Sequence, residues 1–196
     1  MEQTERKKGI NIPNMLSIFR IILIPVFLVL YIGAAEQPYF IIAAVVLLVS
    51  GVTDVLDGFI ARKYKMVTQF GKIIDPLADK LTQLSVCIAV SLRYPWLTIF
   101  LAVVVLKEIL MLIAGTRLMV KKVKITSSQW FGKAGTVIFY VVMLLIVAFP
   151  KLPHGLVYTL VIISAFFMIF AFVMYIPVFM RLNKAPDAQA SEEEQP

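Results

Sequence analysis

The sequence has few of the side chains that build soluble surfaces and most metal centres. It contains one cysteine, Cys87, so no internal disulfide and no cysteine-based metal-ligand pattern is possible. Only 16% of its 196 residues are charged, whereas a soluble domain has about 25%. Hydrophobic residues make up 60% of the chain. These values exclude an ordinary water-soluble domain and indicate a membrane protein.

Six apolar runs are long enough, or nearly so, to cross a bilayer as helices of ~20 residues. They lie at residues 15–34, 39–61, 73–92, 96–120, 134–149 and 155–180. We therefore expect an all-α integral membrane protein with six transmembrane helices and a single membrane domain over residues 1–184. The polar, basic residues 1–12 are expected at the membrane interface, and the acidic tail 185–196 is expected to be disordered.

The distribution of lysine and arginine predicts the orientation. Fourteen of them fall in the segments on one side of the six runs, whereas only Arg93 and Lys151 fall on the other. The basic side is cytoplasmic in membrane proteins. Both termini are therefore expected in the cytoplasm, in a multi-pass protein of a bacterial inner or plasma membrane. The net charge of +7 is explained by these loops and by anionic lipids, so no nucleic-acid partner is expected.

Four carboxylates gather around one cytoplasmic loop. Asp54 and Asp57 are three residues apart near the end of the second run, and Asp75 and Asp79 are four apart at the start of the third. Each spacing places a pair on one helix face. Consecutive spans joined by a short loop are usually neighbours, so the two pairs should face one another.

Such a cluster favours a divalent cation. Four carboxylates in a partly dehydrated site repel one another, and oxygen ligands suit Mg²⁺ or Mn²⁺. A site for one or two ions, most simply two, would suit diphosphate binding. The alternative is a set of interfacial salt bridges to the nearby basic residues Arg62, Lys63, Lys72 and Lys80.

The residues between the pairs could bind phosphate. Gly58 and Gly71 would let a ligand or the backbone approach without a Cβ in the way. Arg62 could hold a phosphate with two hydrogen bonds, and Thr68 could add a hydroxyl group.

The motif resembles the signature of the CDP-alcohol phosphatidyltransferase family. Asp54-Val-Leu-Asp57-Gly58-Phe-Ile-Ala61-Arg62 is followed, after eight residues, by Gly71-Lys-Ile-Ile-Asp75-Pro-Leu-Ala-Asp79. All eight defining positions of the signature match at the right spacing. The resemblance implies transfer of a phosphatidyl group from CDP-diacylglycerol to an alcohol, with release of CMP.

The resemblance also implies roles for individual residues. The metal ligands would be Asp54, Asp57, Asp75 and Asp79, and Asp79 would also be the catalytic base for the acceptor hydroxyl. The CDP-binding residues would be Asn14, Thr53, Gly58, Ala61, Arg62, Thr68 and Gly71. A homodimer is implied as well.

Two acceptor alcohols are compatible with the sequence. The segments Asn11–Arg20 and Gly132-Lys133 resemble the branch of the family that uses glycerol 3-phosphate, which makes this the favoured acceptor. A related branch with a similar N-terminal segment uses phosphatidylglycerol and makes cardiolipin. A phosphate-bearing acceptor needs a cationic pocket, for which Arg117, Lys133 and Arg181 are the candidates. Alternatively, these three side chains anchor the helices to lipid phosphates.

Two further interpretations concern the remaining ionisable residues. Lys107 and Glu108 lie inside an apolar run, where charges are usually paired. Because neighbours on a helix point ~100° apart, we expect Glu108 to orient another basic group such as Arg20 rather than to pair with Lys107. A cation transporter is the alternative from a different functional class, but the only acidic residue expected on the outer side is Glu36.

Overall fold

The computed structural model describes residues 11–193 apart from residues 65, 67, 69 and 121–129. The side chains of residues 62, 72, 115–120 and 181–193 are also outside this description. Residues 1–10, which include most of the predicted interfacial segment, are not described.

The described chain is helical, as predicted. Its elements are α1 (Ile12–Ile32), α2 (Gln37–Lys63), α3 (Gly71–Arg93), the 3-10 turn η1 (Pro95–Leu97), α4 (Thr98–Val120), α5 (Trp130–Ala148) and α6 (His154–Glu193). Each α-helix contains most or all of one of the six apolar runs. Asn11 caps α1, with its side chain accepting from the backbone N–H of Asn14, and Pro13 lies in the first turn.

Among the described residues, five helices are by length and composition apolar enough to cross a membrane, and α3 is not. The prediction of six such helices was therefore wrong for α3. The physical reason is its charge, because Asp75, Asp79 and Lys80 lie in its first turns and Arg93 in its last. The same residues that make α3 a candidate for chemistry make it too polar to qualify by composition.

Helix α6 is longer than the apolar run that predicted it. It contains 40 residues and extends to Glu193, through most of the tail that was expected to be disordered. Alanine and glutamate, which are frequent in this tail, are good helix formers. Composition alone therefore did not indicate where this helix ends.

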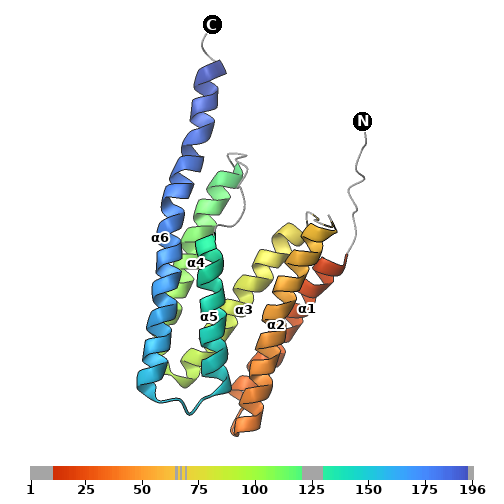
Figure 1. Ribbon diagram of the computed structural model, residues 1–196, viewed down its shortest axis with the longest axis vertical. Helices are drawn as coiled ribbons and strands as arrows, with labels where there is room; N and C mark the ends of the chain where they lie inside the picture. The colour runs from red at the N-terminus through yellow and green to blue at the C-terminus, as the bar shows by residue number, and fades with distance from the viewer. Residues whose placement is uncertain (1–10, 65, 67, 69, 121–129, 194–196) are drawn as a thin grey trace. The chain divides into compact units, whose positions relative to one another are not determined.

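The described chain divides into two compact units. The first comprises residues 1–98 and 143–152, and the second comprises residues 99–142 and 153–196. In the first unit α1 packs against both α2 and α3. Figure 1 shows that α2 ends and α3 begins at the end of this unit where α1 starts.

Helix α1 has its polar side chains inside and its apolar side chains outside. Asn14, Ser17 and Arg20 are each at most 1% exposed, whereas Met15 and Phe19 are more than 40% exposed. This arrangement is the reverse of an amphipathic helix in a soluble protein. It suits a helix whose outer face contacts lipid and whose inner face contacts polar groups of α2 and α3.

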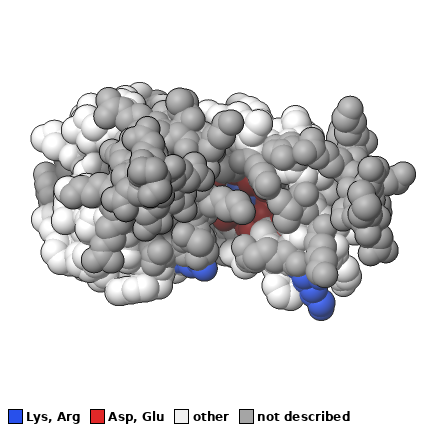
Figure 2. Space-filling view, turned by 90° about the horizontal axis from the view of Figure 1, so that it is seen from above, with Lys and Arg blue, Asp and Glu red and all other residues white. Residues whose placement is uncertain are grey.

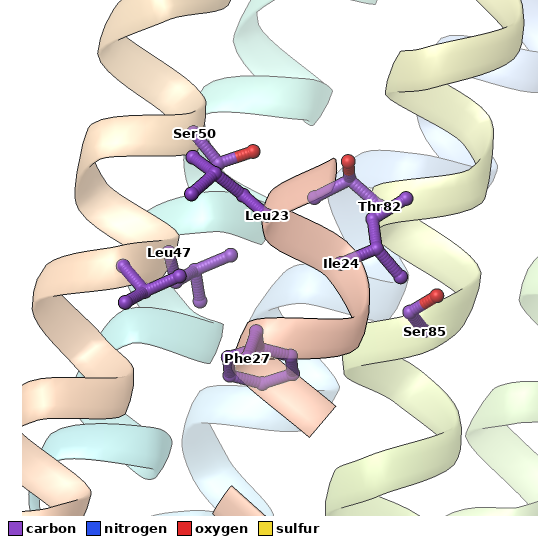
Figure 3. A pocket seen from close by; sticks show the side chains of 8 residues that line it. Leu23, Ile24, Phe27, Leu47, Ser50, Thr82 and Ser85 are labelled. Carbon is purple, nitrogen blue, oxygen red and sulfur yellow. The ribbon is translucent and has the colours of Figure 1, made fainter. Parts of the chain in front are cut away.

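Apolar contacts hold the three helices together below this polar region. A small pocket is lined by Leu23, Ile24 and Phe27 of α1, by Leu47 and Ser50 of α2, and by Thr82 and Ser85 of α3 (Figure 3). The hydroxyl groups of Ser50 and Thr82 also lie at this pocket. The Thr82 hydroxyl donates to the carbonyl of Ala78 at 2.9 Å, whereas the buried Ser50 hydroxyl has no hydrogen-bond partner among the described residues.

In the second unit, glycines let α5 approach α6 closely. A Cβ atom at Gly132 would lie 2.5 Å from the hydroxyl oxygen of Tyr175, and one at Gly135 would lie 3.3 Å from the carbonyl oxygen of Phe167. Small residues commonly allow such contact between membrane helices. The Phe131 and Tyr175 rings pack edge to face beside Gly132, with 4.8 Å between their centroids.

Candidate active site

Four aspartates come together where α2 ends and α3 begins. Asp54 and Asp57 lie one helical turn apart on α2, and Asp75 and Asp79 lie one turn apart on α3. The Asp57 side chain is only 3% exposed, whereas that of Asp54 is 35% exposed. Acidic atoms are visible at the surface when the molecule is viewed from this end (Figure 2).

A single arginine holds the α2 pair. Arg20 Nη1 donates to Asp54 Oδ1 at 2.5 Å, and its Nη2 donates to Asp57 Oδ2. The Arg20 side chain is fully buried. Its guanidinium therefore spans one turn of α2 and compensates part of the charge of two carboxylates.

A serine joins the two pairs. Ser17 Oγ lies 3.1 Å from Asp57 Oδ2 and 2.5 Å from Asp75 Oδ1. The carboxylate of Asp54 also lies close enough to those of Asp75 and Asp79 for their charges to interact. The predicted approach of the two pairs is thus confirmed, and α1 supplies the side chains between them.

Asp79 is held from its own helix. Gln83 Nε2 lies 3.3 Å from Asp79 Oδ1 and 3.2 Å from Asp79 Oδ2. Lys80 Nζ lies 3.5 Å from Asp79 Oδ2. Asp79 remains 18% exposed, so its carboxylate is accessible at the surface of the site.

Of the four basic residues in the salt-bridge alternative, Lys80 contacts an aspartate of the cluster, Asp79. Besides the Lys80 contact, the exposed Lys63 lies over the rings of Phe59 and Tyr64. The side chains of Arg62 and Lys72 are outside the description. Arg20, which the salt-bridge alternative did not include, forms ion pairs with two of the four aspartates.

The donor chemistry of the cluster fits a divalent cation. Arg20 and Ser17 bond to Asp54 Oδ1, Asp57 Oδ2 and Asp75 Oδ1. Within the described part of the chain, the second oxygen of each of these carboxylates accepts no hydrogen bond. Oxygen atoms of this kind are the ligands that Mg²⁺ and Mn²⁺ prefer. As placed, however, no three acidic, histidine or cysteine side chains among the described residues form a group that could hold a metal ion.

The loop before α3 is tied to the start of α1. Asn11 Nδ2 donates to the carbonyl of Met66 at 2.7 Å, and Asn14 Nδ2 donates to Thr68 Oγ1 at 3.0 Å. The Thr68 oxygen in turn accepts from the backbone N–H of Gly71 at 2.9 Å. These bonds place three of the residues implied in CDP binding, Asn14, Thr68 and Gly71, in one connected group.

At position 71 there is no room for a side chain, so glycine is required. A Cβ atom would lie 2.7 Å from Asn14 Oδ1 and 3.1 Å from Thr68 Oγ1. The first distance is too short for any real contact, and Asn14 is 1% exposed. The glycine therefore lets the helix begin against the polar group of α1 and the loop.

The other residues implied in CDP binding lie on α2. Thr53 is 8% exposed, and its hydroxyl donates to the carbonyl of Ser50 at 2.7 Å. Ala61 accepts from the backbone N–H of Met66 at 2.9 Å. Gly58 follows Asp57 within the helix, and the Arg62 side chain is outside the description.

The three candidates for an acceptor pocket lie in the second unit. Lys133 is exposed in the first turn of α5, and the side chains of Arg117 and Arg181 are outside the description. The convergence of these side chains stays a prediction.

The expectation that Glu108 pairs with Arg20 and not with Lys107 was wrong. Lys107 Nζ lies 2.6 Å from Glu108 Oε1, with the Glu108 side chain 7% exposed, and the described ion pairs of Arg20 are with Asp54 and Asp57. A lysine side chain is long and flexible enough to reach a neighbour that points ~100° away. Burial makes that pairing favourable.

Sequence reasoning missed Ser17 and Gln83 and gave Arg20 the wrong partner. A signal was present in α1, because Asn14, Ser17 and Arg20 recur every three residues in an otherwise apolar run. Polar side chains are costly in a membrane helix and usually face a partner. Gln83, four residues after Asp79, follows the same helical spacing.

Comparison with known proteins defines the class of protein. The model of the CDP-alcohol phosphatidyltransferase family matches residues 10–181, and the chain therefore belongs to this family of enzymes. It is 37% identical over 132 residues to the CDP-diacylglycerol–glycerol-3-phosphate 3-phosphatidyltransferase of Escherichia coli K12, covering 64% of this chain and 70% of the relative. The proteins of that name from Shigella flexneri serotype 5b and Shigella sonnei show the same identity and coverage. Family membership replaces the hypothesis of a cation transporter.

Proposed function

We propose that the protein transfers the phosphatidyl group of CDP-diacylglycerol to glycerol 3-phosphate, giving phosphatidylglycerophosphate and CMP. The observation that carries the proposal is the linkage of two aspartate pairs from α2 and α3 into one cluster by α1. Relatives whose names state this reaction are 37% identical to the chain, which supports glycerol 3-phosphate as the acceptor.

Asp54, Asp57, Asp75 and Asp79 would hold Mg²⁺ or Mn²⁺, most simply two ions. The bound cation would supply neutralisation of the diphosphate and of the charge that develops on the leaving CMP. One oxygen of each of Asp54, Asp57 and Asp75 takes no part in the hydrogen bonds to Arg20 and Ser17. These oxygens support the proposal because they are available to a cation.

Asp79 is the proposed general base. It would take the proton of the acceptor hydroxyl while that oxygen attacks the phosphorus that carries the diacylglycerol. The bond from this phosphorus to the oxygen of the CMP phosphate would break, and CMP would leave with the bonding electrons. Asp79 suits this role because it is partly exposed and because Gln83, on the same helix, holds its carboxylate in place.

The connected group formed by Asn14, Thr68 and Gly71 would form one wall of the CDP site. It contains hydroxyl, amide and backbone groups next to Asp75, and its glycine leaves room at the start of α3. Gly58, Ala61, Thr53 and Arg62 would complete the site from α2. The site would face the cytoplasm, where CMP and a water-soluble acceptor exchange with solvent, and the enzyme would act as a homodimer in the membrane.

The acceptor phosphate would be bound by Arg117, Lys133 and Arg181. All three lie near the ends of apolar runs on the side predicted to be cytoplasmic, where a cationic pocket would recognise the phosphate group. The Lys133→Gln variant should raise the KM for glycerol 3-phosphate without raising that for CDP-diacylglycerol. Equal KM values in this variant and the wild type would remove Lys133 from the pocket.

The experiment that tests the function measures CMP release by the purified full-length protein in detergent with CDP-diacylglycerol and Mg²⁺ or Mn²⁺. Glycerol 3-phosphate, phosphatidylglycerol, inositol phosphate and serine are supplied one at a time. Release of CMP and formation of phosphatidylglycerophosphate with glycerol 3-phosphate are expected. Release with phosphatidylglycerol alone would instead assign cardiolipin synthesis.

A further inference from the structure

Arg20 is the most deeply enclosed charge described in the chain. Its side chain is fully buried, on a helix that otherwise presents apolar side chains to its surroundings. Arginine does not lose its proton in proteins, so it cannot avoid the cost of burial by becoming neutral. Its position therefore depends on the two carboxylates that compensate its charge.

The contacts of Arg20 are divided between two aspartates. Each terminal nitrogen bonds to a different carboxylate, and each contact uses only one carboxylate oxygen. Its Nε has no hydrogen-bond partner among the described residues, so the carboxylates are the groups that fix the guanidinium in place. A lysine has no rigid fork and could not span Asp54 and Asp57 in this way.

We propose that Arg20 is a resident cation of the aspartate cluster. It positions Asp54 and Asp57 so that their other oxygens face a divalent ion, and it stays bonded to both when the ion binds. This inference rests on the proposed function, because it assigns a role to Arg20 within the proposed metal and diphosphate site. Arg20 is accordingly a positioning residue.

The positive charge of Arg20 should also affect binding of the substrate's diphosphate. The charges of the four carboxylates and two divalent ions would cancel, and Arg20 adds one positive charge to them. A site with a positive net charge attracts a diphosphate more strongly, particularly where little water screens the charges. Without any metal, Arg20 lowers the repulsion among the carboxylates and lets the cluster persist.

The test compares the full-length wild type with Arg20→Met, Arg20→Lys and the control Lys151→Met, each in the same detergent. Lys151 is exposed in the first unit, and its replacement removes one positive charge away from the cluster. Three quantities are measured: the thermal midpoint in EDTA, its change on titration with Mn²⁺ alone, and Mn²⁺ affinity by electron paramagnetic resonance. CMP release is measured in parallel.

For Arg20→Met we expect the midpoint in EDTA to fall by at least ~5 °C. Mn²⁺ should raise its midpoint by more than it raises that of the wild type, and Mn²⁺ affinity should increase about threefold or more, because removal of the repelling positive charge outweighs the loss of positioning of Asp54 and Asp57. Its CMP release should stay at least about tenfold below wild type in saturating Mn²⁺. Lys151→Met should match the wild type in all measurements.

Arg20→Lys separates charge from geometry. It should keep most of the EDTA midpoint but lose CMP release by about tenfold, since one ammonium group cannot hold both aspartates. Wild-type CMP release in this variant would overturn the positioning role, and this outcome stays decisive if Arg20→Met does not fold. Tighter Mn²⁺ binding together with normal CMP release in Arg20→Met would show that the ion displaces Arg20, and would also overturn the proposal.

The outcomes distinguish this inference from the proposed function. If the wild type releases no CMP with any acceptor, yet the EDTA and Mn²⁺ responses of Arg20→Met follow the expectation, the function is wrong and the resident cation remains. If the wild type is active while Arg20→Met matches it in EDTA and in Mn²⁺, the resident cation is wrong and the function remains.

Discussion

The two aspartate pairs are held by different kinds of partner. Asp54 and Asp57 on α2 are bonded to the buried Arg20, whereas Asp75 and Asp79 on α3 accept from the neutral side chains of Ser17 and Gln83. The negative charge of the α2 pair is thus partly compensated by the positive charge of Arg20. The other pair has no contact with Arg20 among the described residues, and it should depend more on a bound cation.

This difference teaches that the eight positions of the signature are not equivalent in the folded chain. Removing a carboxylate from the α2 pair leaves a buried arginine with less compensation. Removing one from the α3 pair reduces repulsion among the remaining carboxylates. The same chemical change should therefore affect stability in different directions at the two pairs, although both pairs are proposed to serve the same reaction.

The largest effect is expected for Asp57→Asn. Turnover should fall by at least about 10³-fold, because the variant loses a proposed metal ligand and its electrostatic contribution. The protein should also lose about 3–5 kcal/mol of stability, because Arg20 loses one of its two charged partners in a buried setting. CMP release and chemical unfolding in EDTA measure the two effects.

Glu36→Gln is the matched control for Asp57→Asn. It also removes one negative charge from the first unit, at an exposed residue between α1 and α2. We expect wild-type turnover and stability. Unimpaired turnover of Asp57→Asn would end the proposal that this carboxylate holds a metal.

Asp75→Asn should separate activity from stability. Turnover should fall as far as in Asp57→Asn or nearly so, but the stability in EDTA should stay within about 1 kcal/mol of wild type or rise. Ser17 Oγ can still donate to an amide oxygen at this position, so the bond between α1 and α3 is kept. A loss of stability equal to that of Asp57→Asn would break the distinction between the pairs.

The sequence predicted the two aspartate pairs but not the side chains that bind them. The spacing of Asp54, Asp57, Asp75 and Asp79 predicted two helix faces and their approach, because helical geometry and a short loop fix both. It could not show that Arg20 and Ser17 lie between them. That placement depends on how α1 packs, and hydropathy describes α1 only as an apolar run.

Two other features were hidden from the sequence for physical reasons. Charged residues keep α3 from qualifying with the five membrane-spanning candidates, because Asp75, Asp79, Lys80 and Arg93 are spread along it. The Lys107–Glu108 pair was rejected on helical geometry, yet the length of the lysine side chain allows it. Side-chain reach is not visible in residue spacing.

Gly71→Ala should weaken the α3 pair through the loop rather than through a ligand. The new Cβ would press on Asn14 Oδ1 and Thr68 Oγ1, and forcing a methyl group into such a contact costs about 1–3 kcal/mol. We expect that loss of stability and a turnover about tenfold or more below wild type, with a higher KM for CDP-diacylglycerol.

Gly51→Ala is the control for Gly71→Ala. Gly51 lies in α2, and a Cβ atom added there would meet no neighbouring atom within 4 Å, so alanine should be neutral or should stabilise the helix by about 0.5–1 kcal/mol. Similar losses in both variants would mean that glycine is needed for helix flexibility and not for the contacts at the loop.

The smallest effect is expected for Gln83→Leu, which tests the neutral support of Asp79. The variant removes the two contacts to the carboxylate and also a buried Oε1 without a hydrogen-bond partner among the described residues. Losing a hydrogen bond to a charged group costs about 1.5–3 kcal/mol where the partner stays buried, but Asp79 is partly exposed and keeps the Lys80 contact. We therefore expect kcat to fall by up to about tenfold with KM unchanged. Because leucine fills the space without an unpaired polar atom, the stability of the variant should be equal to that of the wild type or higher. A loss of stability with unchanged kcat would mean that Gln83 stabilises the fold and does not orient Asp79.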